Sequence, residues 1–309
     1  MLAVGRQKAV RLNVVSNYFD VRIFSFVSGI IAITLWGCML YVAATQKVYP
    51  GFMRWTVASL LNGIGMICLS LRGILPDFLT IVSANLLIVA FFVLVARGLV
   101  EFAGGQQKTW LDITPVVVLA TTFLYYTYYS PNVSARIVII SLLIALLSGR
   151  SALIISKQVP LILFSTNWFL LISFIMLSGW FFLRAILTLS FENHIVDFMR
   201  PSVLQGFSVM VVFVGNITIV TGLIIINAQR LEHDLIQAKD QVNSLKGLLP
   251  ICSSCKKIRD DEGYWHQVEE YVKRHSEAEF SHGICPDCMK RLYPKYYQKY
   301  LEKQRPPDL

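Results

Sequence analysis

The chain has 309 residues, of which 55% are hydrophobic and only 15% are charged. This composition excludes an ordinary soluble domain, in which about a quarter of the residues are charged. The net charge of +9 arises mainly in residues 1–227, which hold 14 Lys and Arg against 6 Asp and Glu, whereas residues 228–309 are nearly balanced. Because the basic residues flank apolar runs and the tail has no basic stripe, we expect contact with a lipid bilayer and no nucleic-acid binding.

After an N-terminal segment over residues 1–20, the sequence predicts an all-α, polytopic membrane bundle over residues 21–227. A spanning helix needs about 20 mainly apolar residues, and its backbone polar groups cannot be left unpaired in hydrocarbon. Turn-rich or charged segments separate about seven such runs. The predicted transmembrane helices are Val21–Thr45, Met53–Leu71, Phe78–Leu99, Ile113–Tyr129, Ala135–Ile155, Leu161–Leu189 and Val203–Ile226.

Few polar side chains interrupt these runs. Arg184 is the deepest charge, and the default expectation is that such side chains extend to the membrane surface. Four asparagines could either join helices through hydrogen bonds or line a ligand pocket, and we expect mainly the first role. These residues are Asn62, Asn85, Asn167 and Asn216.

The orientation follows from the loops. Seven spans place the two termini on opposite sides, and the loops on the side of the tail hold more basic residues than the opposite loops, where Arg72, Arg136 and Arg200 lie. The basic N-terminal segment argues for the reverse orientation. A reduced compartment suits free thiols better, so we expect a multi-pass protein of the inner (plasma) membrane with a cytoplasmic tail.

Residues 228–249 follow the last span and carry a heptad pattern. Their apolar residues recur at spacings of three and four, which is typical of a coiled-coil seam. The pattern predicts a signalling helix that forms a parallel homodimer through residues 231–249, or alternatively an amphipathic helix that packs on the tail. The seam consists of Leu231, Leu235, Ala238, Val242, Leu245 and Leu249.

Residues 250–294 contain two C-x-x-C pairs, which are Cys252 with Cys255 and Cys285 with Cys288. Two tight turns that each present two thiolates complete a tetrahedral structural Zn²⁺ site, and a redox dithiol or an iron–sulfur cluster is the alternative. Zinc with four protein ligands keeps no position for a reacting water, so we expect a structural ion. The remaining cysteines, Cys38 and Cys68, lie in apolar runs and are expected to be packing residues.

The segment between the pairs is long enough to fold. Residues 260–265 predict a turn between short strands, and residues 268–275 predict a short helix. We therefore expect a small α+β zinc-ribbon-like domain that needs its metal, since so short a chain builds little core. Residues 295–309 form a basic and aromatic C-terminal tail.

The cysteine segment resembles a small module at the C-termini of bacterial signalling proteins. The resemblance rests on residues 245–265 (LKGLLPICSSCKKIRDDEGYW), on residues 279–288 (EFSHGICPDC) and on Leu292-Tyr-Pro. In those proteins the module follows receiver, PAS or multi-helix membrane sensor domains. The resemblance implies a signalling context.

The membrane part resembles the sensor regions that precede diguanylate cyclase domains. The similarity lies in Arg54-Trp55, in residues 71–77 (LRGILPD), in Ala84-Asn85-Leu86 and in Arg97-Gly98-Leu99. The chain has no GGDEF sequence and no kinase histidine box, so the resemblance does not extend to cyclic-di-GMP synthesis or to phosphotransfer.

These features predict a membrane sensor or signalling protein with no catalytic residues, whose zinc module docks a protein partner. Two other classes stay open. A transporter or channel with a regulatory zinc tail would also need a membrane bundle, although the spans lack a set of acidic relay residues and lack internal prolines, apart from Pro115 and Pro160 near helix starts. A thiol or redox enzyme would need exposed cysteines of low pKa.

Overall fold

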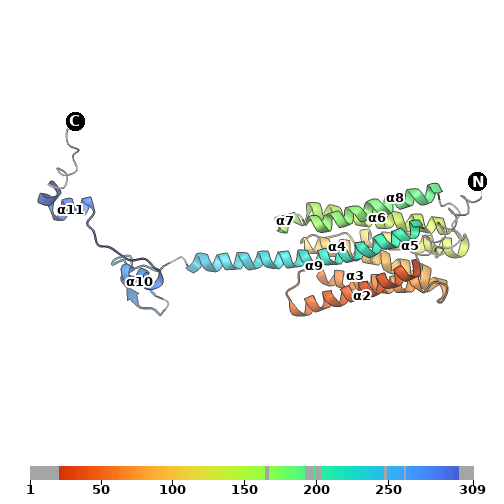
Figure 1. The fold of residues 1–309 in the computed structure, drawn as a ribbon, viewed down its shortest axis with the longest axis horizontal. Helices are drawn as coiled ribbons and strands as arrows, with labels where there is room; N and C mark the ends of the chain where they lie inside the picture. Colours follow the sequence, from red (N-terminus) through yellow and green to blue (C-terminus); the bar gives the residue numbers. More distant parts are fainter. Residues whose placement is uncertain are drawn as a thin grey trace, which may run out of the picture. The chain divides into compact units, whose positions relative to one another are not determined.

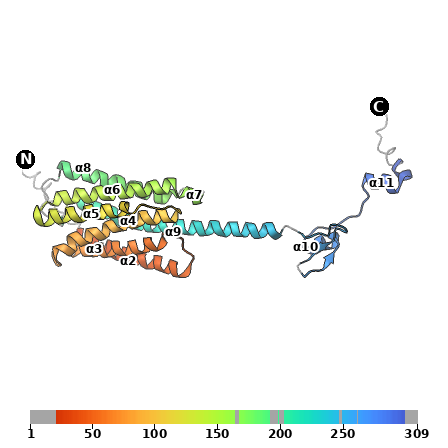
Figure 2. The ribbon, with the colours of Figure 1, turned by 180° about the vertical axis from the view of Figure 1, so that it is seen from behind.

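The protein is described from a computed structural model that covers residues 21–163, 167–191, 198, 203–246, 249–260 and 262–298. The chain forms two compact units, which divide between Gln237 and Ala238. The first unit is a helical bundle (Figures 1 and 2). Its elements are α2 (Val21–Thr45), α3 (Phe52–Ser70), the π-helix η1 (Phe78–Ser83), α4 (Ala84–Phe102), α5 (Trp110–Leu124), the π-helix η2 (Tyr125–Tyr129), α6 (Val133–Lys157), α7 (Pro160–Leu163), α8 (Trp168–Phe191) and α9 (Val203–Lys246).

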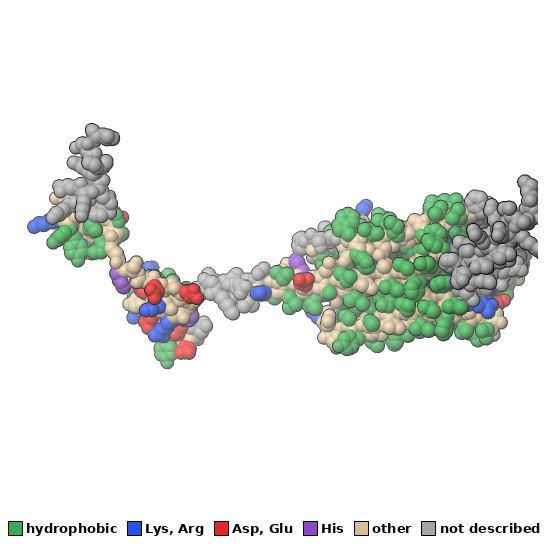
Figure 3. Space-filling model, in the orientation of Figure 1, with side chains coloured by type: hydrophobic (Ala, Val, Ile, Leu, Met, Phe, Trp, Pro, Cys, Tyr) green, Lys and Arg blue, Asp and Glu red, His purple; other side chains and the backbone are tan. Residues whose placement is uncertain are grey.

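Seven helical stretches of the described chain are long and apolar enough to cross a membrane, which confirms the predicted number. Large hydrophobic side chains are exposed along them; Tyr41, Leu146 and Met176, for example, are each about 70% exposed. Figure 3 shows such side chains covering the visible face of the bundle. Soluble monomers rarely expose continuous apolar surface on this scale, so lipid is the solvent that this surface fits.

Two predicted spans have the wrong limits. The run Leu161–Leu189 is not one helix, because α7 ends at Leu163 and α8 begins at Trp168. The side-chain oxygen of Asn167 accepts a hydrogen bond from the backbone N–H of Leu170 at 2.9 Å, and this cap starts a new helix. The last span does not end at Ile226, since α9 continues without a break to Lys246.

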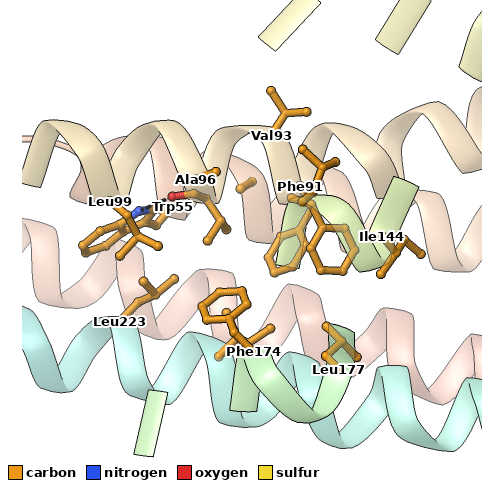
Figure 4. Packing of buried hydrophobic residues seen from close by; sticks show 14 of the residues in the cluster. Trp55, Phe91, Val93, Ala96, Leu99, Ile144, Phe174, Leu177 and Leu223 are labelled. Carbon is orange, nitrogen blue, oxygen red and sulfur yellow. Dashed lines mark hydrogen bonds between the residues drawn. The ribbon is translucent and has the colours of Figure 1, made fainter. Parts of the chain in front are cut away.

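Aromatic and aliphatic side chains fill the bundle core. Trp55, Phe91 and Phe174 are each at most 2% exposed, and Figure 4 shows them among Leu99, Leu177 and Leu223. The indole nitrogen of Trp55 donates to the backbone carbonyl oxygen of Val95 at 3.2 Å, which joins α3 to α4. Buried Trp needs such a partner, so this contact fixes the rotation of α3 against α4.

The crossing of α3 and α4 requires a residue without a side chain at position 98. A Cβ atom on Gly98 would overlap the indole ring of Trp55 and would lie 2.9 Å from the carbonyl oxygen of Gly51. Small residues let membrane helices approach closely. Gly98 therefore allows the contact that the Trp55 side chain makes.

We expect Gly98→Ala to destabilise the bundle by about 1–3 kcal/mol, the usual effect of overpacking, although alanine is the better helix former. Gly37→Ala is the matched control, because a Cβ atom there meets nothing within 4 Å. Thermal unfolding of both variants in detergent measures the difference. Equal midpoints for the two variants would contradict this packing argument.

The second unit contains a small sheet and two short helices. Strands β1 (Ile258–Arg259) and β2 (Trp265–His266) pair antiparallel, and Ile251 makes one further bridge to Ile258. Gly263 has a φ of +94° in the turn between the strands, as the predicted turn requires. Helix α10 (Val268–His275) is confirmed with its predicted limits, and α11 is Pro286–Leu292. The zinc-ribbon part of the fold class stays a prediction.

Predicted segments at the two ends and in one loop lie wholly or partly outside the described residues. They are residues 1–20, the loop around residues 192–202, and the C-terminal tail after Gln298. For the heptad seam, Leu231 packs against the core and Leu235 is 61% exposed, while the side chains of Val242 and Leu245 are not described. The homodimer stays a prediction.

Candidate functional site

The first cysteine pair lies on a tight turn between the bridged residues Ile251 and Ile258. The backbone N–H of Cys252 donates to the carbonyl of Lys257 at 2.9 Å, and the N–H of Lys256 donates back to the carbonyl of Cys252 at 3.0 Å. Lys256 has a φ of +61°, in the left-handed region. This geometry turns the chain sharply after Cys255, so that both thiols of the pair face each other.

The second pair lies at the start of α11. Cys285 is the N-cap residue with an extended backbone, Pro286 is the first helical residue, and Cys288 follows in the first turn. The N–H groups at the start of a helix have no partners within the helix and favour negative charge. A thiolate at position 285 is therefore stabilised by its place in the fold.

Backbone N–H groups lower the pKa of one thiol in each pair. The N–H of Cys255 and then that of Ser254 lower the pKa of Cys252. The N–H of Cys288 lowers the pKa of Cys285, and the Cys288 thiol adds to this effect, while its own pKa is raised by the Cys285 thiol. Each pair thus holds one thiol that ionises readily, which suits metal ligation as well as redox chemistry.

The structure brings the cysteines together as two pairs. Among the described residues, no three His, Cys, Asp or Glu side chains are grouped so that they could hold a metal ion. The donor set itself fits zinc, because two thiolate pairs on rigid turns are the usual components of a four-sulfur site. The single centre of Cys252, Cys255, Cys285 and Cys288 stays a prediction.

Two of the three histidines between the pairs have other partners. His266 Nε2 lies 2.6 Å from Asp260 Oδ2, and the ring of His275 stacks on Tyr271. Burial would raise the pKa of Asp260, but the N–H of Tyr264 and the His266 ring lower it overall. Asp260 therefore stabilises the β1–β2 turn as a carboxylate, and the ring of His266 is engaged with Asp260 in this turn.

A second polar site, which the sequence did not reveal, surrounds α9 at one end of the bundle. We call Tyr49, Phe102, Asn227, Arg230 and Asp234 the α9 anchor cluster. The buried side-chain oxygen of Asn227 accepts from the N–H of Tyr49 at 3.1 Å, and the Tyr49 hydroxyl donates to Asp234 at 2.5 Å. Both contacts tie α9 to the loop between α2 and α3.

Arg230 joins the cluster to the end of α4. Its guanidinium donates to the carbonyl of Phe102 at 2.6 Å and lies 4.3 Å from the centre of the Tyr49 ring and 5.1 Å from that of Phe102. Cation–π contacts of this kind contribute about 0.5–1 kcal/mol at exposed positions and more when desolvated. Lys47 adds an ion pair to Asp234 at 3.3 Å.

Ion pairs continue from the anchor cluster along the same end of the bundle. Arg54 pairs with Glu101 at 2.5 Å, Arg97 pairs with Glu101 at 3.6 Å, and Arg97 also donates to Asp112. Asp112 accepts from Gln107 as well. These contacts connect α3, α4 and α5. A movement of α9 at the anchor cluster would therefore act on helix ends that are joined to one another.

Burial raises the pKa of Tyr49 from 10 to about 12, and the hydrogen bond to Asp234 contributes in the same direction. The sign follows from linkage: the folded state favours the protonated hydroxyl, so its stabilising effect is full below pH 10 and is lost as the pH rises towards 12. We expect the unfolding midpoint of the protein to fall over this range, and Tyr49→Phe to lose that part of the dependence.

Thermal unfolding between pH 8 and 12 measures this effect, with Tyr41→Phe as the control because Tyr41 is 70% exposed on α2. The control should follow the natural chain at every pH. Identical pH profiles for Tyr49→Phe and the natural chain would show that the hydroxyl does not anchor α9.

The four deep asparagines divide between the two roles considered for them. Asn167 donates to Gln229 on α9 at 3.2 Å, which is a contact between helices, and it also caps α8. Asn85 bonds to the carbonyl of Ile81 in its own helix and lines a cavity. Asn62 and Asn216 are buried, and neither side-chain polar atom of Asn216 has a hydrogen-bond partner among the described residues.

These features define a multi-pass helical membrane protein whose last long apolar helix, α9, carries a polar extension. No protein-family model, curated protein or solved structure matches the chain. The function therefore has to be argued from the residues themselves.

Proposed function

We propose that the chain is an integral membrane sensor in which α9 passes a change in the bundle to a zinc-stabilised cysteine module that docks a signalling partner. The observation that carries the proposal is α9 itself. One uninterrupted helix, Val203–Lys246, begins in the bundle, passes the anchor cluster and ends beyond the limit of the first unit. A continuous helix that begins in one unit and ends in the other is a direct way to transmit displacement or rotation.

The anchor cluster supports this role because its contacts are largely polar and come from several parts of the bundle. Hydrogen bonds and ring contacts from the α2–α3 loop and from α4 converge on three α9 residues, Asn227, Arg230 and Asp234. A switch of this kind requires contacts that can exchange for others, and polar contacts at a helix end meet that requirement better than apolar packing. The cluster lies after the apolar part of α9, where the helix leaves the hydrocarbon.

The cysteine module supports a docking role. Two C-x-x-C turns with one readily ionised thiol each would hold a structural zinc ion through Cys252, Cys255, Cys285 and Cys288. The ion would supply folding free energy to a unit that builds little core, because Ile258 is its one fully buried large apolar side chain among the described residues. A cytoplasmic location, the bacterial signalling context and the absence of catalysis belong to the same proposal.

The proposed sensor acts as a homodimer along α9. The seam of residues 231–249 extends back into the membrane at the same alternating spacing of three and four, through Ala228, Ile224, Thr221 and Ile217 to Val214, Met210 and Phe207. Phe207, Met210 and Val214 are each more than 40% exposed and line an apolar groove beside α8. A second copy would pack on this exposed part of the face, because Ile224 and Leu231 further along the seam pack against the bundle core.

Hydrogen exchange of the intact protein in nanodiscs tests the proposal. A substitution in the anchor cluster should change exchange in residues 251–259 of the module, which it does not touch. Unchanged exchange in the module, with altered exchange in α9, would show that the two units act independently. Solute flux through reconstituted vesicles would instead support the transporter or channel alternative.

A further inference from the structure

A cavity lies among the helix ends at residues 69–85, 123 and 133–140, and it holds two arginines. Its cavity volume is about 40 Å³, which is room for the charged group of an anion. The end of α3, the start of α4, the end of α5 and the start of α6 surround it. Polar groups come from Arg72, Thr80, Asn85 and Arg136, and the rest of the lining is apolar, including Phe123 and Ile137.

Arg136 is the residue that requires an explanation. The sequence placed it in a loop, but it belongs to α6 and is only 7% exposed. One guanidinium nitrogen donates to the hydroxyl of Thr127 at 3.2 Å, and Nε has no hydrogen-bond partner among the described residues. A guanidinium that is buried without a counter-charge is unfavourable, because it loses its hydration and gains little in return.

The charges around Arg136 favour an anion in the cavity. Arg72 lines the same cavity and acts on Arg136 as a like charge, while Asp77 is the acidic group whose field reaches it and is exposed. None of the ion pairs between described residues includes Arg136. Guanidinium groups bind carboxylate and phosphate oxygens with paired, charge-assisted hydrogen bonds.

One π-helix lines the cavity and another bonds to Arg136, which gives a second, independent observation. Thr80 and Ile81, which line it, belong to η1, and Thr127, which binds Arg136, belongs to η2. A π-helix replaces the regular hydrogen bonds of an α-helix with a less stable pattern, and single turns of this kind are frequent at functional sites. Of the two π-helices in the described chain, η1 thus lines the cavity and η2 supplies the hydrogen-bond partner of Arg136.

We propose that this cavity binds the carboxylate or phosphate group of an organic anion, with Arg136 as the residue that binds it and Arg72 adding positive charge to the lining. The inference deepens the proposed function and rests on it, because the bound anion would be the signal that the bundle detects. The anionic group could belong to a free small molecule or to a lipid headgroup, and both present the same chemistry to the arginines.

Thermal unfolding of the purified full chain tests the site in two arms. The first arm adds benzoate or its uncharged counterpart benzamide in detergent, and the second compares nanodiscs of phosphatidylglycerol with those of phosphatidylcholine. A ligand that binds only the folded state raises the unfolding midpoint. We expect a rise of several degrees with benzoate or with phosphatidylglycerol and none with the uncharged partner, and the arm that responds identifies the source of the anion.

The variants make the test specific. Arg136→Gln should weaken the binding at least about tenfold, the usual effect of losing a charge-assisted hydrogen bond, and Arg136→Lys should weaken it less. Arg150→Gln, on the same helix but away from the cavity, should bind as the natural chain does. The inference is overturned if neither anion stabilises the natural chain, or if Arg136→Gln and Arg150→Gln respond alike.

The binding test does not depend on any response of the cysteine module. It therefore separates the proposed anion site from the proposed sensor mechanism. Anion binding in a chain whose module does not respond to the anchor cluster would leave the site intact and defeat the sensor mechanism. A responsive module in a chain that binds no anion would do the reverse.

Discussion

Removing zinc from the intact protein, or replacing Cys285 with serine, is expected to unfold the C-terminal module and leave the membrane bundle folded. Structural zinc contributes roughly 10–16 kcal/mol to small domains. The described part of the module has one fully buried large apolar residue, Ile258, and a sheet of only two short strands, which cannot replace that free energy. Limited proteolysis and hydrogen exchange with and without a chelator measure the loss of structure in residues 250–294.

The chain contains its own control for this experiment. Cys38 and Cys68 lie on α2 and α3, outside the module, so Cys38→Ser and Cys68→Ser should leave metal content and protection unchanged. Cys252→Ser should behave as Cys285→Ser does, because one ion requires both pairs. A module that stays protected from exchange after chelation would contradict the structural role of zinc.

The second large effect is expected at the anchor cluster. Arg230→Ala should lower the free energy of local opening of α9 by about 2 kcal/mol. The substitution removes a charge-assisted hydrogen bond to the carbonyl of Phe102 and the contacts with two aromatic rings. Such bonds contribute about 1.5–3 kcal/mol, and partial exposure of Arg230 places the loss towards the lower end. Exchange of residues 227–237 should therefore become about thirtyfold faster.

Lys239→Ala is the matched control, since Lys239 is an exposed cation on the same helix beyond the cluster. It should leave exchange at residues 227–237 unchanged. If Arg230→Ala and Lys239→Ala gave the same exchange rates, Arg230 would have no anchoring role and the coupling of α9 to the bundle would need another explanation.

The membrane bundle could be predicted from sequence because lipid imposes a simple rule on each segment. Any apolar run of sufficient length must be helical, and for α2 the predicted and observed limits are identical at Val21 and Thr45. The rule fails where a helix ends for local reasons inside an apolar run. Asn167 caps α8 through a single hydrogen bond, and hydropathy averaged over a window does not detect it.

The extension of α9 shows a different limit of sequence patterns. The charged residues after Asn227 predict that α9 becomes more exposed to water. The side chains of residues 235–239 are indeed exposed. Their spacing does not show that Arg230 contacts rings at positions 49 and 102, because those partners are distant in sequence and are selected by helix packing. Only the fold shows that the first turns of the predicted linker belong to the bundle.

Arg136 illustrates the same limit for the cavity. Its place beside a loop favoured a side chain directed towards water, as is usual for arginine at a membrane surface. The structure directs it inward to Thr127, a residue of a π-helix that no periodicity predicted. For the cysteines, the spacing predicts one site of four thiols, whereas the structure groups the described thiols only as two pairs.

X-ray absorption at the zinc edge, on the intact purified protein, tests the central claim most directly. We predict one zinc ion per chain with four sulfur neighbours at roughly 2.3 Å. A folded module without metal, zinc with only two sulfur neighbours, or disulfide bonds within the C-x-x-C pairs would contradict the account.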